Sequence, residues 1–164
     1  MIYGVESDLT KVRYQNFEEL RGYCYQVASV VGLICLQIFG YKDDAAREYA
    51  VDLGLALQLT NIARDVQEDL GFGRIYLPQD EIVRFGYSED ELEAGIVNES
   101  FIELMRFQAQ RARGYFDSGF KLLPYLSPRS RACPAVMGQL YSKVLDRIEA
   151  AGFDVFQRRI SLSK

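Results

Sequence analysis

The chain has 164 residues, of which 49% are hydrophobic and 26% are charged, and these values are typical of one globular domain spanning residues 1–164. The net charge of −4 offers no general excess of positive charge, so we expect no binding to nucleic acid. The absence of histidine excludes Ser-His-Asp triads and histidine-ligated metals, which leaves carboxylates, tyrosine and arginine to supply any chemistry.

Cysteine usage and hydropathy indicate a cytoplasmic location. Cys24, Cys35 and Cys133 are an odd set without a C-x-x-C pair, which favours free thiols in a reducing compartment. The most apolar run, residues 27–39, is interrupted by polar residues and falls short of the ~20 residues that span a bilayer. We therefore predict neither a transmembrane helix nor a signal peptide.

A long, mostly buried helix is predicted after an irregular opening over residues 1–14. Asn16 followed by Glu19 is typical of an N-cap with its capping-box partner, and Gly40 supplies a stop after Phe39. We therefore expect a helix that runs from about residue 16 to residue 39.

One face of this helix carries little side-chain volume. Tyr23, Val27 and Val31 share a stripe, with Ala28 and Gly32 beside it. Small residues of this kind allow a neighbouring helix to pack closely, or they leave a groove in which a ligand can lie. The pattern alone leaves both alternatives open.

The next predicted helix, over residues 45–70, holds the main concentration of polar residues. Asp43 or Asp44 can cap it, and Gly71 supplies its stop. Its buried face is formed by apolar side chains at helical spacing, namely Leu55, Leu59, Ile62, Val66 and Leu70.

A polar stripe made of Gln58, Asn61, Asp65 and Asp69 lies next to that apolar face. Two carboxylates one turn apart, preceded by an amide oxygen, are the hard oxygen donors that Mg²⁺ takes, and Mg²⁺ commonly joins protein carboxylates to a phosphorylated substrate. The stripe therefore suggests a diphosphate site. The plain alternative, which the spacing alone leaves open, is a solvated acidic helix face.

The following segments are shorter. Gly71 and Gly73 bracket a turn, and residues 74–77 predict a loop that folds over the site. Two short helices are then expected, one over residues 78–85 and one from Ser88, with Glu91 as its capping-box partner, to a stop at Gly95.

Two further long helices complete the predicted elements, and no alternating pattern predicts a strand. Residues 98–123 form an amphipathic helix, and residues 127–151 form the last one, with a kink expected at Pro134. We expect a solvated position for three arginines of the first of these helices, Arg106, Arg111 and Arg113. The architecture predicted is an all-α helical bundle.

Residues Gln58 to Pro78 read Q-L-T-N-I-A-R-D-V-Q-E-D-L-G-F-G-R-I-Y-L-P, and this string closely resembles the second aspartate-rich motif of the squalene/phytoene synthase family. The run Y-C-Y-x-V-A-x-x-V-G from Tyr23 to Gly32 resembles the family's prenyl-pocket helix, with Ser29 where glycine is common, a departure expected to affect pocket shape. The resemblance implies an isoprenoid synthase-type fold and Mg²⁺-dependent head-to-head (1′-1) condensation of two prenyl diphosphates. The products would be presqualene diphosphate or squalene from farnesyl diphosphate, or phytoene from geranylgeranyl diphosphate.

The resemblance also implies roles for individual residues, with Mg²⁺ as the cofactor and a prenyl diphosphate as the substrate. The catalytic set is Asp65, Asp69, Arg64 and Tyr76; the metal ligands are Asn61, Asp65 and Asp69; the substrate-binding set is Tyr23, Val27, Ala28, Val31, Gly32, Gln58, Asn61, Arg74, Tyr141 and Arg158. Release of an apolar product implies peripheral contact with a membrane. Within the family, the sequence of residues Tyr23–Gly32 slightly favours a bacterial presqualene diphosphate or squalene-type synthase over phytoene synthase.

The family's first aspartate-rich motif lies upstream of the residues that match positions 1–14, and Asp8 has no second aspartate four residues on. The chain therefore resembles the C-terminal part of a longer enzyme, a bundle without its N-terminal helices. A truncated gene model, a domain fragment and a non-catalytic relative that binds an isoprenoid, a lipid or a protein partner all fit this pattern. The sequence leaves these alternatives open.

Overall fold

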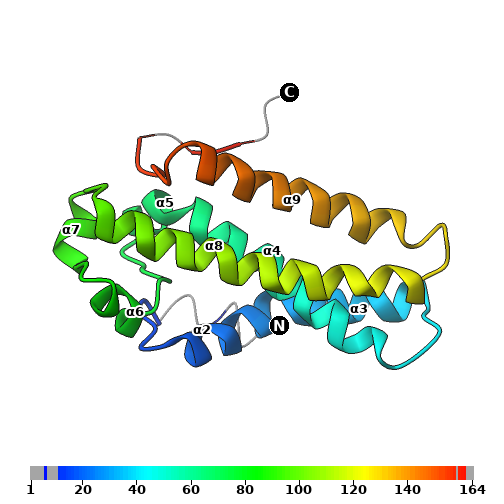
Figure 1. The fold of residues 1–164 in the computed structure, drawn as a ribbon. Helices are drawn as coiled ribbons and strands as arrows, with labels where there is room; N and C mark the ends of the chain where they lie inside the picture. Colours follow the sequence, from blue (N-terminus) through cyan, green and yellow to red (C-terminus); the bar gives the residue numbers. More distant parts are fainter. Residues whose placement is uncertain (1–5, 7–10, 158, 162–164) are drawn as a thin grey trace.

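The computed structural model describes residue 6, residues 11–157 and residues 159–161, and within them the chain is helical, without a strand (Figure 1). The elements in chain order are α2 (Phe17–Cys24), the π-helical turn η1 (Tyr25–Ser29), α3 (Val30–Phe39), α4 (Ala46–Arg64), α5 (Val66–Gly71), α6 (Gln79–Arg84), α7 (Glu89–Glu93), α8 (Glu99–Gly119), the 3-10 helix η2 (Phe120–Tyr125) and α9 (Ala132–Ala150). The predicted all-α architecture is confirmed.

The first long helix consists of α2, η1 and α3 and has the predicted ends. The Asn16 side chain accepts a hydrogen bond from the Glu19 amide, and Gly40 ends α3 with a φ of 70°. The prediction that this helix is mostly buried is wrong, because Ile34 is 48% exposed and Ile38 is 75% exposed. Residues 17–39 also form, among the described residues, the one helix long and apolar enough to cross a membrane by length and composition, and an 18-residue window within it has a mean hydropathy of 1.5.

Helix α4 lies at the centre of the bundle, alongside α8 and between α9 and the α2–α3 helix (Figure 1). Two glycines permit its closest contacts. A Cβ on Gly54 would lie 2.6 Å from the Ser29 Cα, and one on Gly119 of α8 would lie 2.8 Å from the Leu53 Cα. Backbone therefore packs directly on backbone at these crossings. The close-packing alternative for the small-residue face of the first helix also holds at Gly32, where a Cβ would lie 3.0 Å from the Ala50 carbonyl oxygen.

The predicted helix over residues 45–70 is interrupted at Asp65. Its φ of −101° and ψ of 18° lie outside the helical range, so α4 ends at Arg64 and α5 begins at Val66. The hydrogen bonds from the Asp65 amide to the Asn61 carbonyl and from the Asp69 amide to the Asp65 carbonyl persist, at 2.8 and 2.9 Å. The break is therefore a local kink, and the predicted apolar face stays buried, with Leu55, Leu59, Ile62 and Val66 each at most 5% exposed.

The expectation that Arg111 is solvated is wrong. Its guanidinium forms a salt bridge with Glu81 of α6, donates to Gln108 and lies 3.8 Å from the centre of the Phe17 ring. The side chains of Arg111 and Glu81 are only 14% and 8% exposed. This ion pair joins α6, α8 and the start of α2. Arg113, two residues on, has its side chain 35% exposed and pairs with Asp146 and Glu149.

The last helix begins five residues later than predicted. Ser127 accepts a hydrogen bond from Ser130 and its carbonyl accepts one from Arg131, which forms a separate turn ahead of α9. Pro134 consequently falls in the first turn of α9, where no earlier helical carbonyl requires its missing N–H. A proline in the first turn does not force a helix to bend, so the physical reason for the kink predicted at Pro134 no longer applies.

Candidate functional site

A polar cavity of about 300 Å³ opens at the junction of α4 and α5. It is lined by Tyr23, Gln58, Asn61, Ile62, Arg64, Asp65, Asp69, Tyr76 and Tyr141. These residues come from α2, from α4 and α5, from the loop after α5, and from α9. The structure thus brings together most of the residues that the sequence singled out.

Asp65 forms a two-point ion pair with Arg64 at the edge of this cavity. Its Oδ1 accepts from the Arg64 Nε at 2.7 Å and its Oδ2 accepts from an Arg64 terminal nitrogen at 2.5 Å, while the Arg159 Nε donates to the same Oδ1 at 3.1 Å. Burial acts to raise the pKa of Asp65, but the hydrogen bonds and charge of Arg64, followed by those of Arg159, outweigh it and hold that pKa below its ordinary value.

This lowered pKa predicts a pH dependence of stability. A carboxylate with a depressed folded-state pKa stabilises the protein fully above its unfolded-state value of about 4, and this stabilisation is lost as pH falls through the folded-state pKa. The difference in free energy of unfolding between the unmodified chain and Asp65→Asn should therefore be constant between about pH 5 and 7. It should shrink below about pH 4. Urea denaturation of both proteins across this range measures it, and a difference independent of pH would contradict the assignment.

The loop over residues 73–78 places Tyr76 and Arg74. It is fixed by the segment before α2, because the Ile75 amide donates to the Val12 carbonyl at 2.9 Å and Arg13 donates to the Gly73 carbonyl at 2.8 Å. In the described residues this pairing also yields an isolated parallel bridge between Arg13 and Ile75. The predicted loop over the site is confirmed, and hydrogen bonds hold it in place.

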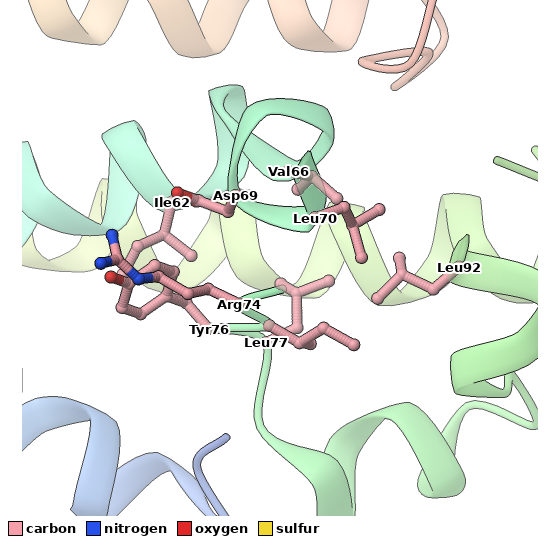
Figure 2. A pocket seen from close by; sticks show the side chains of 9 residues that line it. Ile62, Val66, Asp69, Leu70, Arg74, Tyr76, Leu77 and Leu92 are labelled. Carbon is pink, nitrogen blue, oxygen red and sulfur yellow. The ribbon is translucent and has the colours of Figure 1, made fainter. Parts of the chain in front are cut away.

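Figure 2 shows the polar ends of Asp69, Arg74 and Tyr76 gathered on one side of a small gap, with Leu70, Leu77 and Leu92 on the other. Arg74 does not line the 300 Å³ cavity, but Asp69 and Tyr76 line both spaces. The three polar groups therefore stand at the wall between the cavity and the apolar core.

Three tyrosines cluster beside these groups. The rings of Tyr14, Tyr23 and Tyr76 have centroids 5.3 to 5.7 Å apart, and the Tyr23 hydroxyl donates to the Tyr76 hydroxyl at 3.4 Å. Tyr23 and Tyr76 are each 8% exposed. The cluster presents two hydroxyls at the wall of the cavity in an otherwise aromatic surrounding.

The donor set is compatible with a Mg²⁺ ion that is shared with a ligand. Asn61 donates to Gln58, and its Oδ1 is buried without a hydrogen-bond partner among the described residues, an arrangement that a cation would satisfy. Among the residues the structure describes, no group of three or more His, Cys, Asp or Glu side chains could hold a metal. Two carboxylates and one amide oxygen therefore fit Mg²⁺ only with water or phosphate oxygens completing its shell.

An apolar groove of about 410 Å³ runs from this cavity along α4, between the α2–α3 helix and α9. Gln58, Asn61 and Tyr141 line both spaces, so the polar cavity and the groove lie next to each other. Val27, Ala28, Val31 and Gly32 line the groove, together with Cys35, Leu36, Phe39, Ala50, Leu53, Gly54, Leu57, Leu122, Leu126, Cys133, Pro134 and Met137. The face of small residues thus borders a groove as well as packing closely on α4.

The family profile for squalene/phytoene synthase matches residues 1–164. The chain belongs to the squalene/phytoene synthase family. Phytoene synthase 2, chloroplastic, of Solanum lycopersicum is 44% identical over 100% of this chain and 55% of its own length, and 15-cis-phytoene synthase of Synechococcus elongatus is 40% identical over 97% and 56%. The chain therefore spans about half the length of the curated relatives it matches.

Solved structures of this family share the fold. Squalene synthase HpnC from Alicyclobacillus acidocaldarius superposes with a TM-score of 0.90 at 29% identity, over 93% of this chain and 58% of that one. A dehydrosqualene synthase in complex with ligand gives a TM-score of 0.87 at 29% identity, over 94% and 55%. The predicted isoprenoid synthase-type fold is confirmed.

The squalene/phytoene synthase resemblance pointed to some residues that the structure places elsewhere, and it missed others. Arg158 lies outside the described residues, whereas its neighbour Arg159 reaches Asp65 and Glu68. Ser29 does not line the groove, because it is buried and its hydroxyl donates to the Val51 carbonyl at 2.8 Å, so any effect of Ser29 on pocket shape would act through helix packing. The R-R-I sequence near the C-terminus was the available signal for Arg159.

Proposed function

We propose that this chain supplies the diphosphate-binding part of an enzyme that condenses two prenyl diphosphates head to head. The observation that carries the proposal is that the polar cavity and the apolar groove lie side by side and share Gln58, Asn61 and Tyr141 as lining residues. An allylic diphosphate has the same division, a charged head and a long hydrocarbon chain. Family membership supports the assignment.

The residues of the cavity would act on the diphosphate head group. Asn61, Asp65 and Asp69 would hold Mg²⁺, which when bound supplies positive charge that stabilises the departing diphosphate. Arg64 and Arg74 would add donors to the phosphate oxygens. These contacts favour ionisation of the allylic carbon–oxygen bond because they stabilise charge that develops on the leaving group.

The groove would act on the rest of the substrate. Its walls on α3, α4 and α9 are apolar, so a prenyl chain lying between them would be held away from water. Exclusion of water protects an allylic carbocation from hydrolysis until the double bond of the second substrate attacks it. Tyr23 and Tyr76 would stand beside the reacting carbons and the leaving group.

We propose geranylgeranyl diphosphate as the substrate and phytoene as the product. This differs from the sequence of residues Tyr23–Gly32, which favoured a squalene-type enzyme. Relatives named phytoene synthases are 40 to 44% identical to this chain, whereas the squalene and dehydrosqualene synthase structures are 29% identical. An apolar product such as phytoene partitions into a bilayer, so we also propose peripheral membrane contact. We propose a cytoplasmic location for the enzyme itself.

Ligand binding and turnover test the proposal together. The chain should bind geranylgeranyl diphosphate in the presence of Mg²⁺ and lose this binding in EDTA, as measured by calorimetry, and geranylgeraniol is the control without a diphosphate. We expect negligible turnover by the 164 residues alone, and phytoene formation once the chain is joined to the upstream half of the Synechococcus elongatus relative. If geranylgeranyl diphosphate bound equally well with and without Mg²⁺, the metal-dependent site would be refuted. If the joined protein bound geranylgeranyl diphosphate but formed no product, the chain would be a non-catalytic relative.

A further inference from the structure

Two arginines contact Asp65, and they differ in exposure and in the number of hydrogen bonds that they donate. Arg64 is its neighbour in the chain and binds both carboxylate oxygens, and the side chains of this pair are each 16% exposed. Arg159 comes from the segment after α9, makes one hydrogen bond to Oδ1 and is 53% exposed. The contact with Arg159 is therefore the weaker and more easily broken of the two.

The position of Arg159 is set by the segment that carries it. Val155 and Ile160 anchor this segment in the core, at 1% and 8% exposure. From there the Arg159 Nε reaches Glu68 as well as Asp65, at 3.3 and 3.1 Å. The guanidinium thus bridges two carboxylates at the rim of the polar cavity, and about half of the Arg159 side chain is exposed to solvent.

This arrangement conflicts with a divalent cation at Asp65. A carboxylate offers about four lone-pair positions, and the two arginines use both of those on Oδ1 and one on Oδ2. Arg64 is tied to Asp65 by its adjacent position and its two hydrogen bonds. One position on Oδ2 stays open, so a cation that uses Oδ1, or both oxygens, would have to displace Arg159. A cation on Oδ2 alone would still be repelled by the Arg159 guanidinium bound to the same carboxylate.

We propose that Arg159 is the counter-cation of the metal-free site, and that it competes with the divalent cation for Asp65 and so sets the affinity of the site for metal. The inference rests on the proposed function, because it assumes that Asp65 takes part in binding Mg²⁺. In this proposal, Asn61, Asp65 and Asp69 hold the metal and Arg159 opposes its binding. In the empty protein, Arg159 and Arg64 together neutralise Asp65 and limit the repulsion between Asp65 and Glu68.

Mn²⁺ binding measured by electron paramagnetic resonance tests this competition without any turnover, because Mn²⁺ takes the same oxygen ligands as Mg²⁺. Without diphosphate, Arg159→Gln should bind Mn²⁺ about fivefold more tightly than the unmodified chain, since one positive charge next to the cation is removed. Arg159→Lys, which keeps the charge, should stay close to the unmodified chain. Arg113→Gln is the matched control, because Arg113 also bridges two carboxylates at the surface, Asp146 and Glu149.

The outcomes separate this proposal from the proposed function. Equal Mn²⁺ affinity in Arg159→Gln and Arg113→Gln would overturn the role of Arg159 while leaving the metal site intact. Weaker binding in Arg159→Gln would also overturn it, because Arg159 would then support the site. If neither the unmodified chain nor any variant binds Mn²⁺, the metal site itself fails. In a direct readout, the ¹⁵N signal of the Arg159 Nε–H, assigned through its loss in Arg159→Gln, should shift when Mg²⁺ is added.

Discussion

Replacing Asp69 with asparagine is expected to reduce the Mg²⁺-dependent affinity of the chain for inorganic diphosphate about a hundredfold, or ~2.7 kcal/mol. Of the described residues, Asp65 and Asp69 are the two carboxylates that line the polar cavity, and Asp65 already accepts hydrogen bonds from two arginines. Loss of the Asp69 charge would leave a Mg²⁺–diphosphate pair with a single, largely neutralised carboxylate. Calorimetric titration with diphosphate, with and without Mg²⁺, measures the effect.

The control for this substitution is Asp117→Asn, which removes an equal charge from an exposed position on α8. Its affinity for diphosphate should match that of the unmodified chain. If Asp69→Asn and Asp117→Asn behaved alike, the acidic stripe would be a solvated helix face and the diphosphate would bind elsewhere.

Replacing Arg111 with glutamine is expected to lower the free energy of unfolding by about 3–5 kcal/mol, because it leaves the buried Glu81 carboxylate without its cationic partner. The substitution also removes the guanidinium from the faces of Phe17 and Phe107, which lie 3.8 and 4.6 Å from it. Urea denaturation followed by circular dichroism measures the loss.

Arg113→Gln is again the comparison, since Arg113 lies on the same helix two residues away and its partners Asp146 and Glu149 are solvent-accessible. An exposed pair of this kind contributes ~0–1 kcal/mol, so this variant should unfold close to the unmodified chain. A loss of similar size in both variants would mean that Arg111 is no more important than a surface arginine. Glu81→Gln should restore part of the stability to Arg111→Gln, because it removes the unpaired charge.

The sequence predicted the elements whose ends depend on local chemistry. Asn16 and Ser88 cap their helices through their own side chains, and Gly40 ends α3 because it adopts a positive φ that other residues avoid. The polar cavity was predictable for a similar reason. Gln58, Asn61, Asp65 and Asp69 follow one another at helical spacing, so they reach one place whatever surrounds them.

Features that depend on distant segments were not predictable. Arg111 and Arg113 look alike in the sequence, and only the approach of Glu81 from α6 buries one of them. Arg159 is 94 residues from Asp65, so no local pattern joins the two. The exposed outer face of α3 was also missed, because an apolar helix predicts burial without indicating how much of its surface neighbouring helices cover.

The glycine contact between α4 and the α2–α3 helix has a consequence for how this site can diverge. Because the backbone of Gly54 rests on that of Ser29, the spacing of the two helices is fixed by main chain and does not depend on the side chains that line the groove. Substitutions at lining positions such as Val31 or Leu57 are therefore expected to lengthen or shorten the groove without moving Asn61 or Asp65. In the enzyme proposed above, preference for a given prenyl chain length could therefore change by single mutations while the head-group site stays unchanged.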